Sequence, residues 1–420
     1  MDVNSAPESA APEGESHATQ APHAPVNVID DRDEYLAAVA AIAEGHGPIG
    51  IDAERASGYR YSQRAYLIQI FRRGAGTFLF DPPAIGDFVE LNDLIADEEW
   101  ILHAATQDLT CLREVGLHPS RLFDTELGAR LAGLPRVGLG TVVEHLLGIH
   151  LAKEHSSADW STRPLPQAWL VYAALDVELL VDLREALGEL LDSADKHDIA
   201  QQEFDSVLSR DLSNVRAEPW RRLSGVHSLR GGKNLAIARE LWLARDAYAQ
   251  EVDTAPGRLV PDSALLAAAR FLPESKRQLS AMKEFSGRAS RTQIDRWWDA
   301  IQAGLASTDI PASRVSNDAL PPPRVWSDKN PEADLRLKAA RATMSERSEE
   351  LSIPIENLLT PDYLRRVAWT PPADISAESV SEALQALGAR QWQIDVSAQS
   401  IAQAFVEAHQ TPEESDDTES

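Results

Sequence analysis

The chain has 420 residues, 43% of them hydrophobic, and a formal net charge of −26 at pH 7. This length predicts two to four domains, and the lack of a long apolar run argues against a membrane-spanning protein. The first twenty residues lack the basic and apolar parts of a secretory signal. A single cysteine, Cys111, excludes an internal disulfide framework and is interpreted as a core residue. We therefore expect a cytoplasmic protein.

Charge is distributed unevenly along the chain. Residues 26–195 hold 28 acidic and 13 basic side chains, whereas residues 210–300 hold 16 basic and 11 acidic ones. A polyanion responds to local potential and not to total charge, so the net acidity does not exclude a nucleic-acid partner. Solvated helix faces explain the basic block equally well. Its candidate contacts to nucleic acid are Arg221, Arg222 and Lys233.

Residues 1–25 are rich in Ala, Pro, Ser and Glu, and we expect them to form a disordered tail. The strands and helices that the sequence predicts begin after this tail. In residues 26–205, strand and helix signals are mixed, which predicts an α/β domain with a central sheet. The expected strands are 49–55, 65–71, 77–82 and 100–105, and the expected helices are 108–117, 124–134 and 166–191.

From residue 212 onward only helical patterns remain. Residues 212–305 are expected to form a small all-α domain, and residues 306–331, rich in Pro, Ser, Asn and Asp, a linker. A second helical domain is expected over 332–408 and an acidic disordered tail over 409–420.

Asp52 and Glu54 lie two residues apart on an expected strand, so both side chains should project from one face. Paired carboxylates repel each other unless a cation neutralises them, and oxygen-only ligand sets favour hard ions such as Mg²⁺ or Mn²⁺. An exposed acidic strand end is the alternative interpretation.

Tyr172 and Asp176 lie four residues apart in an expected helix, which stacks them on one face. Asp108 follows an expected strand and opens a helix. A surface Tyr–Asp pair and a helix-capping aspartate are the alternative explanations.

The order and spacing of these five residues resemble the three motifs of the DEDD superfamily of 3′–5′ exonucleases. Tyr172 matches the tyrosine branch, since Val171 stands where the other branch has its histidine. The stretches LFDTELGARLAGL and ADWSTRPLPQAWLVYAALDVELLVDL resemble bacterial ribonuclease D. The region with Trp220 and Trp297 resembles an HRDC domain.

This resemblance implies a fold and a chemistry. The fold would be an α/β ribonuclease H-like exonuclease domain with a mixed central sheet, followed by two all-α HRDC-type domains. Asp52, Glu54, Asp108 and Asp176 would hold two divalent cations, Mg²⁺ or Mn²⁺, and Tyr172 would orient the attacking water. The activity would be two-metal-ion hydrolysis of RNA from its 3′ end, releasing nucleoside 5′-monophosphates.

The sequence leaves the roles of several further residues open. His103, Gln107 and Arg163 are candidate substrate contacts, although a histidine at a strand end is commonly a core residue. Gln69 and Trp160 could face the site or pack in the core. We expect the substrate to be tRNA precursors or other small structured RNAs. A 3′–5′ DNA exonuclease acting on single-stranded DNA and a non-catalytic nucleic-acid-binding scaffold are the alternatives, and the oligomeric state stays open.

Overall fold

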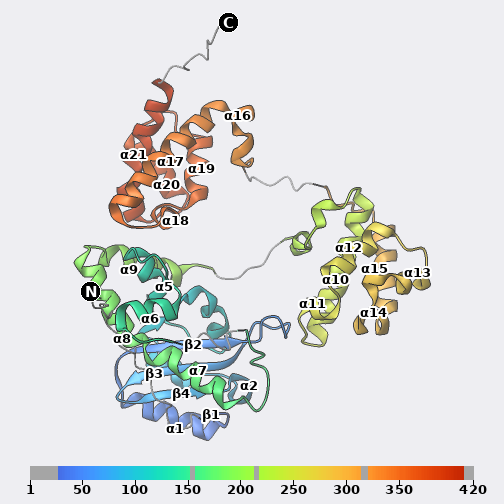
Figure 1. Ribbon diagram of the computed structural model, residues 1–420, viewed down its shortest axis with the longest axis horizontal. Coiled ribbons are helices and arrows are strands. Elements are labelled where there is room, and N and C mark those ends of the chain that lie inside the picture. Colours follow the sequence, from blue (N-terminus) through green and yellow to red (C-terminus); the bar gives the residue numbers. More distant parts are fainter. Residues whose placement is uncertain (1–26, 152–156, 212–216, 314–319, 411–420) are drawn as a thin grey trace, which may run out of the picture.

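The computed structural model describes residues 27–151, 157–211, 217–313 and 320–410, which fold into three parts (Figure 1). We call them the N-terminal domain (27–211), the middle domain (217–313) and the C-terminal domain (320–410). The tail predicted over 1–25 and most of that predicted over 409–420 lie outside the described residues. Residues 409 and 410 differ from the prediction, since the last helix continues through them. In the described part of the chain, no helix has the length and apolarity to cross a bilayer.

A six-stranded mixed sheet organises the N-terminal domain. Its strands are β1 (Val28–Ile29), β2 (His46–Arg55), β3 (Ala65–Arg73), β4 (Gly76–Phe80), β5 (Glu99–Leu102) and β6 (Arg121–Asp124). The order across the sheet is β1-β4-β3-β2-β5-β6. The β2–β3 and β3–β4 pairs are antiparallel, and the other pairs are parallel. The mixed sheet expected from the sequence is therefore confirmed.

The two faces of β2 differ as its alternating sequence predicts. Ile49, Ile51 and Ala53 are buried in the main hydrophobic core, while Asp52 and Glu54 project from the opposite face. This strand therefore presents two carboxylates on one side of a buried sheet.

Helices surround the sheet. In the N-terminal domain they are α1 (Arg32–Ala43), α2 (Pro82–Ile85), α3 (Val89–Ile95), η1 (Ala105–Gln107), α4 (Leu109–Glu114), α5 (Thr125–Leu131), α6 (Leu139–Leu147), α7 (Gln167–Glu178), α8 (Leu180–Ser193) and α9 (His197–Ser209). Helix α7 packs over β2, β3 and β4. The contact with β2 is close, because a Cβ built on Gly50 would lie 2.8 Å from the Val177 carbonyl oxygen. This close approach brings the side chains of α7 onto the acidic face of β2.

The middle domain is all helical, as expected, and has its own hydrophobic core. Its helices are η2 (Pro219–Arg222), η3 (Val226–Ser228), α10 (Gly232–Glu251), α11 (Pro256–Leu259), α12 (Asp262–Phe271), α13 (Lys276–Ala281), η4 (Lys283–Phe285), α14 (Arg288–Thr292) and α15 (Ile294–Ala306). Trp220, Phe285 and Trp297 are its large buried aromatic residues.

The C-terminal domain begins earlier than the sequence pattern predicts. Its helices are η5 (Pro323–Val325), α16 (Trp326–Lys329), α17 (Pro331–Leu351), α18 (Ile355–Leu358), α19 (Pro361–Trp369), α20 (Ala377–Ala386) and α21 (Gln391–Gln410). Trp326, expected in the linker over 306–331, is fully buried and packs edge-on against Trp369, with ring centroids 4.8 Å apart. The proline-rich sequence before Trp326 predicts a linker, and α16, with four residues, is too short to show helical periodicity. The sequence pattern therefore does not reveal this buried residue.

The C-terminal domain also shares a continuous core with the N-terminal domain. At their contact, buried Glu203 of α9 accepts two hydrogen bonds from Arg390, at 2.5 and 2.8 Å, and one from the Trp392 indole at 2.8 Å. Lys196 donates to the carbonyl oxygens of Leu131 and Ser352. A buried carboxylate with three donors anchors the two domains together.

Candidate active site

One cavity of about 550 Å³ brings together all five residues singled out from the sequence. They are Asp52, Glu54, Asp108, Tyr172 and Asp176. Two of them come from β2, two from α7, and one from the segment that follows β5. Residues more than a hundred positions apart in the chain therefore meet as the sequence analysis predicts.

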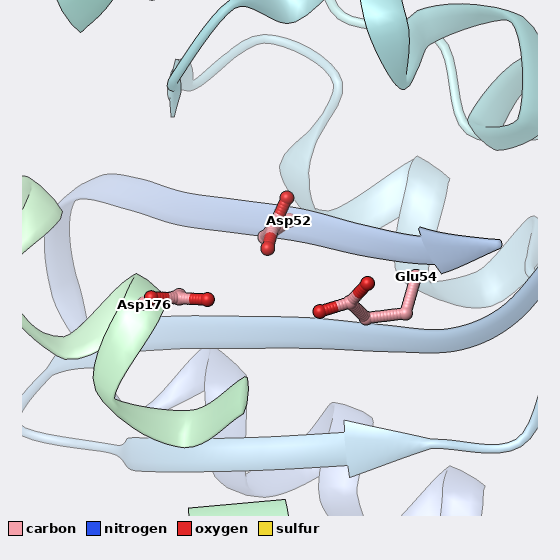
Figure 2. A group of neighbouring side chains, drawn as sticks. All are labelled: Asp52, Glu54 and Asp176. Atoms are coloured by element: carbon pink, nitrogen blue, oxygen red, sulfur yellow. The ribbon is translucent and has the colours of Figure 1, made fainter. Parts of the chain in front are cut away.

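Three of the carboxylates converge closely. Figure 2 shows Asp52 and Glu54 projecting from β2 towards Asp176 on α7. One carboxylate oxygen from each residue can be chosen so that all three lie within 4.8 Å of one another. This is the spacing of a group that can share a cation, since oxygens at such distances can ligate one ion together.

Asp108 lies beside this group and is held differently. It is buried at the N-cap position of α4 but forms no capping hydrogen bond with its side chain. Its carboxylate instead lies 3.7 Å from the Arg55 guanidinium. Asp108 therefore stands at the helix start as expected but forms no capping hydrogen bond, and its carboxylate is available to the cavity.

A neighbouring aspartate braces the segment that carries Asp108. The buried Asp124 carboxylate accepts hydrogen bonds from the backbone N–H groups of Ala104 and Ala105, at 3.0 and 2.9 Å. It also caps α5 through the N–H groups of Glu126 and Leu127. These bonds stabilise Ala104 in the left-handed backbone region, at φ 59°, where an alanine is rare. Asp124 thus fixes the turn between β5 and Asp108.

Burial raises the pKa values of all four carboxyl groups in the cavity. The pKa of Asp52 rises to about 6, and that of Glu54 to about 10, because the negative charges of Asp52 and Asp176 reinforce the effect of burial. Burial, and then the charge of Asp52, raise the pKa values of Asp108 and Asp176 well above the usual range. The four groups cannot all be ionised at neutral pH unless positive charge joins them.

The donor set identifies the kind of charge that fits. The converging groups offer carboxylate oxygens and neither histidine nitrogen nor cysteine sulfur. Such a set suits a hard divalent cation. The cavity therefore has the chemistry of a divalent-cation site.

Tyr172 lies one helical turn before Asp176 on α7 and hydrogen bonds with its carboxylate. Burial, followed by the charges of Asp176 and Glu54, raises the pKa of the Tyr172 hydroxyl far above its usual value. The hydroxyl therefore keeps its proton throughout the physiological pH range. It can orient a polar group in the cavity but cannot act as a base.

The raised pKa values predict how stability depends on pH and on cations. In EDTA, the pKa of Glu54, about 10, keeps a proton on this group in the native protein that the unfolded chain has released, so stability should fall as pH rises from about 6.5 to about 8.5. The raised pKa values of Asp108 and Asp176 act in the same direction. Each carboxyl group that stays protonated contributes up to about 1.4 kcal/mol per pH unit. Mg²⁺ should therefore raise the melting temperature more at the higher pH, as thermal unfolding with and without Mg²⁺ would show.

The pH window avoids an opposing contribution from His103. Burial lowers the pKa of His103 to about 4, so its protonation in the unfolded chain destabilises the fold only below about pH 6.5. A melting temperature in EDTA that stays constant or rises across the window would contradict the carboxylate assignment. An equal gain from Mg²⁺ at both pH values would contradict it as well.

The other predicted contacts in this part of the chain fall into two groups. His103 and Gln107 line the cavity, although His103 is partly buried and its Nδ1 lies 2.9 Å from the Thr125 hydroxyl. Gln69 is fully buried on the face of β3 that adjoins Asp52. Trp160 is also fully buried and packs against Trp169, so it fills the core and is not exposed to stack on a base.

Arg163 has a structural environment that differs from the substrate contact we predicted. Its guanidinium donates to the buried Asp81 carboxylate at 2.5 Å and to the carbonyl oxygens of Tyr66, Trp160 and Thr162. These bonds occupy all three of its nitrogen atoms and tie the segment before α7 to the sheet. The arginine positions the backbone and does not line the cavity.

Two of the three predicted basic contacts also have intramolecular partners. Arg221 forms an ion pair with Glu218, and its guanidinium carbon lies 4.4 Å from the centroid of the Trp220 ring. Lys233 donates to carbonyl oxygens at the end of α15. Arg222 is exposed and stays a candidate for nucleic-acid contact.

The middle domain contacts residues that line the cavity, a feature that sequence reasoning missed. Ser57, Gly58 and Tyr59 are among the lining residues. Arg258 of α11 donates a hydrogen bond to the Gly58 carbonyl oxygen at 2.5 Å. Its guanidinium carbon lies 4.0 Å from the centroid of the Tyr59 ring. The Ala255 N–H donates to the Tyr59 carbonyl oxygen at 3.0 Å. One wall of the cavity is therefore held from outside the N-terminal domain, through contacts with no local sequence signal.

Comparisons with known protein families agree with this site. A family model described as a 3′-5′ exonuclease matches residues 26–192, an HRDC domain model matches 234–301, and a model described as a 3′ to 5′ exonuclease C-terminal domain matches 319–405. A mixed sheet that places acidic side chains in one cavity, together with these matches, defines a 3′–5′ exonuclease.

Individual related proteins show which family of 3′–5′ exonucleases this is. The chain is 31% identical to ribonuclease D of Jannaschia sp. over 313 residues, which is 72% of this chain and 78% of that protein. It is 27% identical to ribonuclease D of Escherichia coli over 78% of this chain and 85% of that one. The chain belongs to the ribonuclease D family and is a 3′–5′ exoribonuclease.

Solved structures show the same architecture. A crystal structure of a protein from Bifidobacterium adolescentis matches with a TM-score of 0.83 and 38% identity, covering 91% of this chain and 97% of that one. The crystal structure of Escherichia coli RNase D matches with a TM-score of 0.65 and 25% identity, covering 86% and 98%. The exonuclease domain, the HRDC domain and the helical C-terminal region are thus common to this chain and that enzyme.

Proposed function

We propose that Asp52, Glu54, Asp108 and Asp176 hold two divalent cations, Mg²⁺ or Mn²⁺, that serve hydrolysis of the 3′-terminal phosphodiester of RNA. The observation that carries this proposal is the convergence of three carboxylates within 4.8 Å, with Asp108 and Tyr172 in the same cavity. When bound, two such cations would lower the pKa of a water molecule and offset the negative charge that develops on the phosphate.

The side chains have separate tasks in this chemistry. The carboxylates hold the cations and cannot bind the phosphate directly, because like charges repel. Tyr172, which keeps its proton, orients the attacking water for in-line displacement of the 3′ oxygen. The products are a nucleoside 5′-monophosphate and an RNA shortened by one nucleotide.

The proposed substrates are tRNA precursors and other small structured RNAs. The related Escherichia coli enzyme is described as an exoribonuclease involved in structured RNA processing, which supports this choice. The single cysteine supports a reducing cytoplasm as the place of action. A 3′–5′ DNA exonuclease is the second candidate, since recognition of RNA depends on contacts with the 2′-hydroxyl group. The five site residues and the family assignment disfavour a non-catalytic scaffold.

A single assay tests activity, polarity and polymer choice. The enzyme is incubated with 5′-labelled RNA or DNA of identical sequence, in Mg²⁺, Mn²⁺ or EDTA. We expect a ladder shortening from the 3′ end of RNA with either cation, no ladder in EDTA, and little shortening of DNA. An equal ladder on DNA would favour the second candidate, and equal activity in EDTA would contradict the cation-dependent chemistry.

A further inference from the structure

A buried glutamine lies next to the acidic cluster, and its side-chain amide forms no hydrogen bond with the part of the chain that the structure describes. Gln69 on β3 is fully buried, and it stands directly opposite Asp52 in the β2–β3 register. Neither its amide nitrogen nor its amide oxygen has a hydrogen-bond partner among the residues that the structure describes. Because directly opposed residues project from one face of a sheet at short range, Gln69 is an immediate neighbour of the Asp52 side chain.

Apolar side chains flank Gln69 on this face of the sheet. Leu67 and Leu79 project from the same face of the sheet, and they share a small hydrophobic cluster with Ala173 of α7. A leucine or methionine would satisfy such a position, whereas a buried amide without partners destabilises a fold. A buried amide without partners in a native protein needs an explanation. A state of the protein in which the Gln69 amide does form a hydrogen bond would provide it.

We propose that Gln69 is a positioning residue for the cation site, and that its amide N–H donates to the Asp52 carboxylate when the cations are bound. The inference rests on the proposed two-cation function. A carboxylate that ligates an ion with one oxygen can accept a hydrogen bond, and such partners fix the orientation of the ligand. The Gln69 amide is placed to do this from the sheet, while Tyr172 reaches Asp176 from the helix.

The substitution Gln69→Met tests this role, because methionine has a similar length and no amide. We expect the dissociation constant for Mn²⁺, measured by calorimetry without RNA, to rise about 10- to 100-fold. The melting temperature in EDTA should stay the same or rise, since a buried unpartnered amide has been removed. In the RNA assay, kcat at limiting Mn²⁺ should fall while KM for RNA is retained.

Leu79→Met is the matched control. Leu79 stands opposite Gln69 on β4, is equally buried and projects from the same face, but it lies on the side away from Asp52. Its substitution should leave Mn²⁺ affinity unchanged. Wild-type affinity in Gln69→Met would overturn the proposal, and so would a lower melting temperature in EDTA with unchanged Mn²⁺ affinity, because that result indicates a purely structural amide.

A measurement on the wild-type enzyme keeps the test independent of how well the variant folds. A crystal structure with Mn²⁺ should show the Gln69 amide nitrogen within about 3.2 Å of an Asp52 carboxylate oxygen. An amide without that contact would overturn the proposal. Failure of the underlying function looks different: the wild-type chain would then bind Mn²⁺ no better than Asp52→Asn does. Tight binding by the wild type, lost in Asp52→Asn but kept in Gln69→Met, defeats only the role of Gln69.

Discussion

Asp52→Asn is expected to lower kcat for RNA hydrolysis by about 10³-fold or more, equivalent to roughly 4 kcal/mol of transition-state stabilisation. Asparagine keeps the shape of the side chain but removes the charge that a cation requires. Asp52 adjoins both Glu54 and Asp176, and its charge raises the pKa values of its neighbours. Its loss therefore affects the whole cluster and not one ligand alone. Single-turnover kinetics at saturating RNA would measure the effect.

The same substitution should leave the fold intact. In EDTA, the melting temperature of Asp52→Asn should equal or exceed that of the wild type, because one source of repulsion among buried carboxylates is gone. Asp182→Asn is the control, since Asp182 is an exposed acid on α8 that pairs with Arg73 outside the cavity. Wild-type activity in Asp52→Asn, or an equal loss of activity in Asp182→Asn, would contradict the assignment.

Tyr172→Phe is expected to lower kcat by about 10²-fold with little change in RNA affinity. The ring, which packs against the cluster that includes Leu67 and Leu79, is retained, and only the hydroxyl that orients the water is lost. Because burial keeps the hydroxyl protonated, the pH dependence of kcat in the wild type should show no ionisation of Tyr172 up to about pH 9. Rapid-quench kinetics and RNA binding in Ca²⁺ would separate the chemical step from affinity.

A conservative change elsewhere serves as the control for Tyr172→Phe. Tyr248 lies in the middle domain and packs edge-on against Trp297, so Tyr248→Phe removes a hydroxyl far along the chain from the cavity. Its kcat should equal that of the wild type. A Tyr172→Phe enzyme with unchanged kcat would refute the water-orienting role, and a loss confined to RNA affinity would assign the hydroxyl to substrate binding.

The central part of the site could be predicted because local periodicity determines it. Strand alternation places Asp52 with Glu54, and helical spacing places Tyr172 with Asp176. The structure brings these pairs together because α7 packs closely on β2 at Gly50. The sequence does not reveal that Arg55 faces Asp108, or that Asp124 braces the turn before it. Each of those contacts joins two segments that lie far apart in the chain, so no local sequence pattern predicts it.

Other features could not be predicted for similar reasons. Strands β1 and β6 have two and four residues, too few for a two-residue period to be evident. The helix expected over 166–191 is divided at Leu179, where neither proline nor glycine marks the break. Arg163 was expected at the substrate, yet the partner that engages it, Asp81, lies 82 residues earlier. Charge and motif position alone do not distinguish a binding arginine from a buried structural one.

The central claim is that the four acidic residues hold two cations. The most direct measurement is anomalous diffraction from crystals of the wild-type enzyme grown with Mn²⁺. We expect two anomalous peaks in the cavity, ligated by oxygens of Asp52, Glu54, Asp108 and Asp176. A single peak, peaks outside the cavity, or no peak at Mn²⁺ concentrations that support full activity would contradict it.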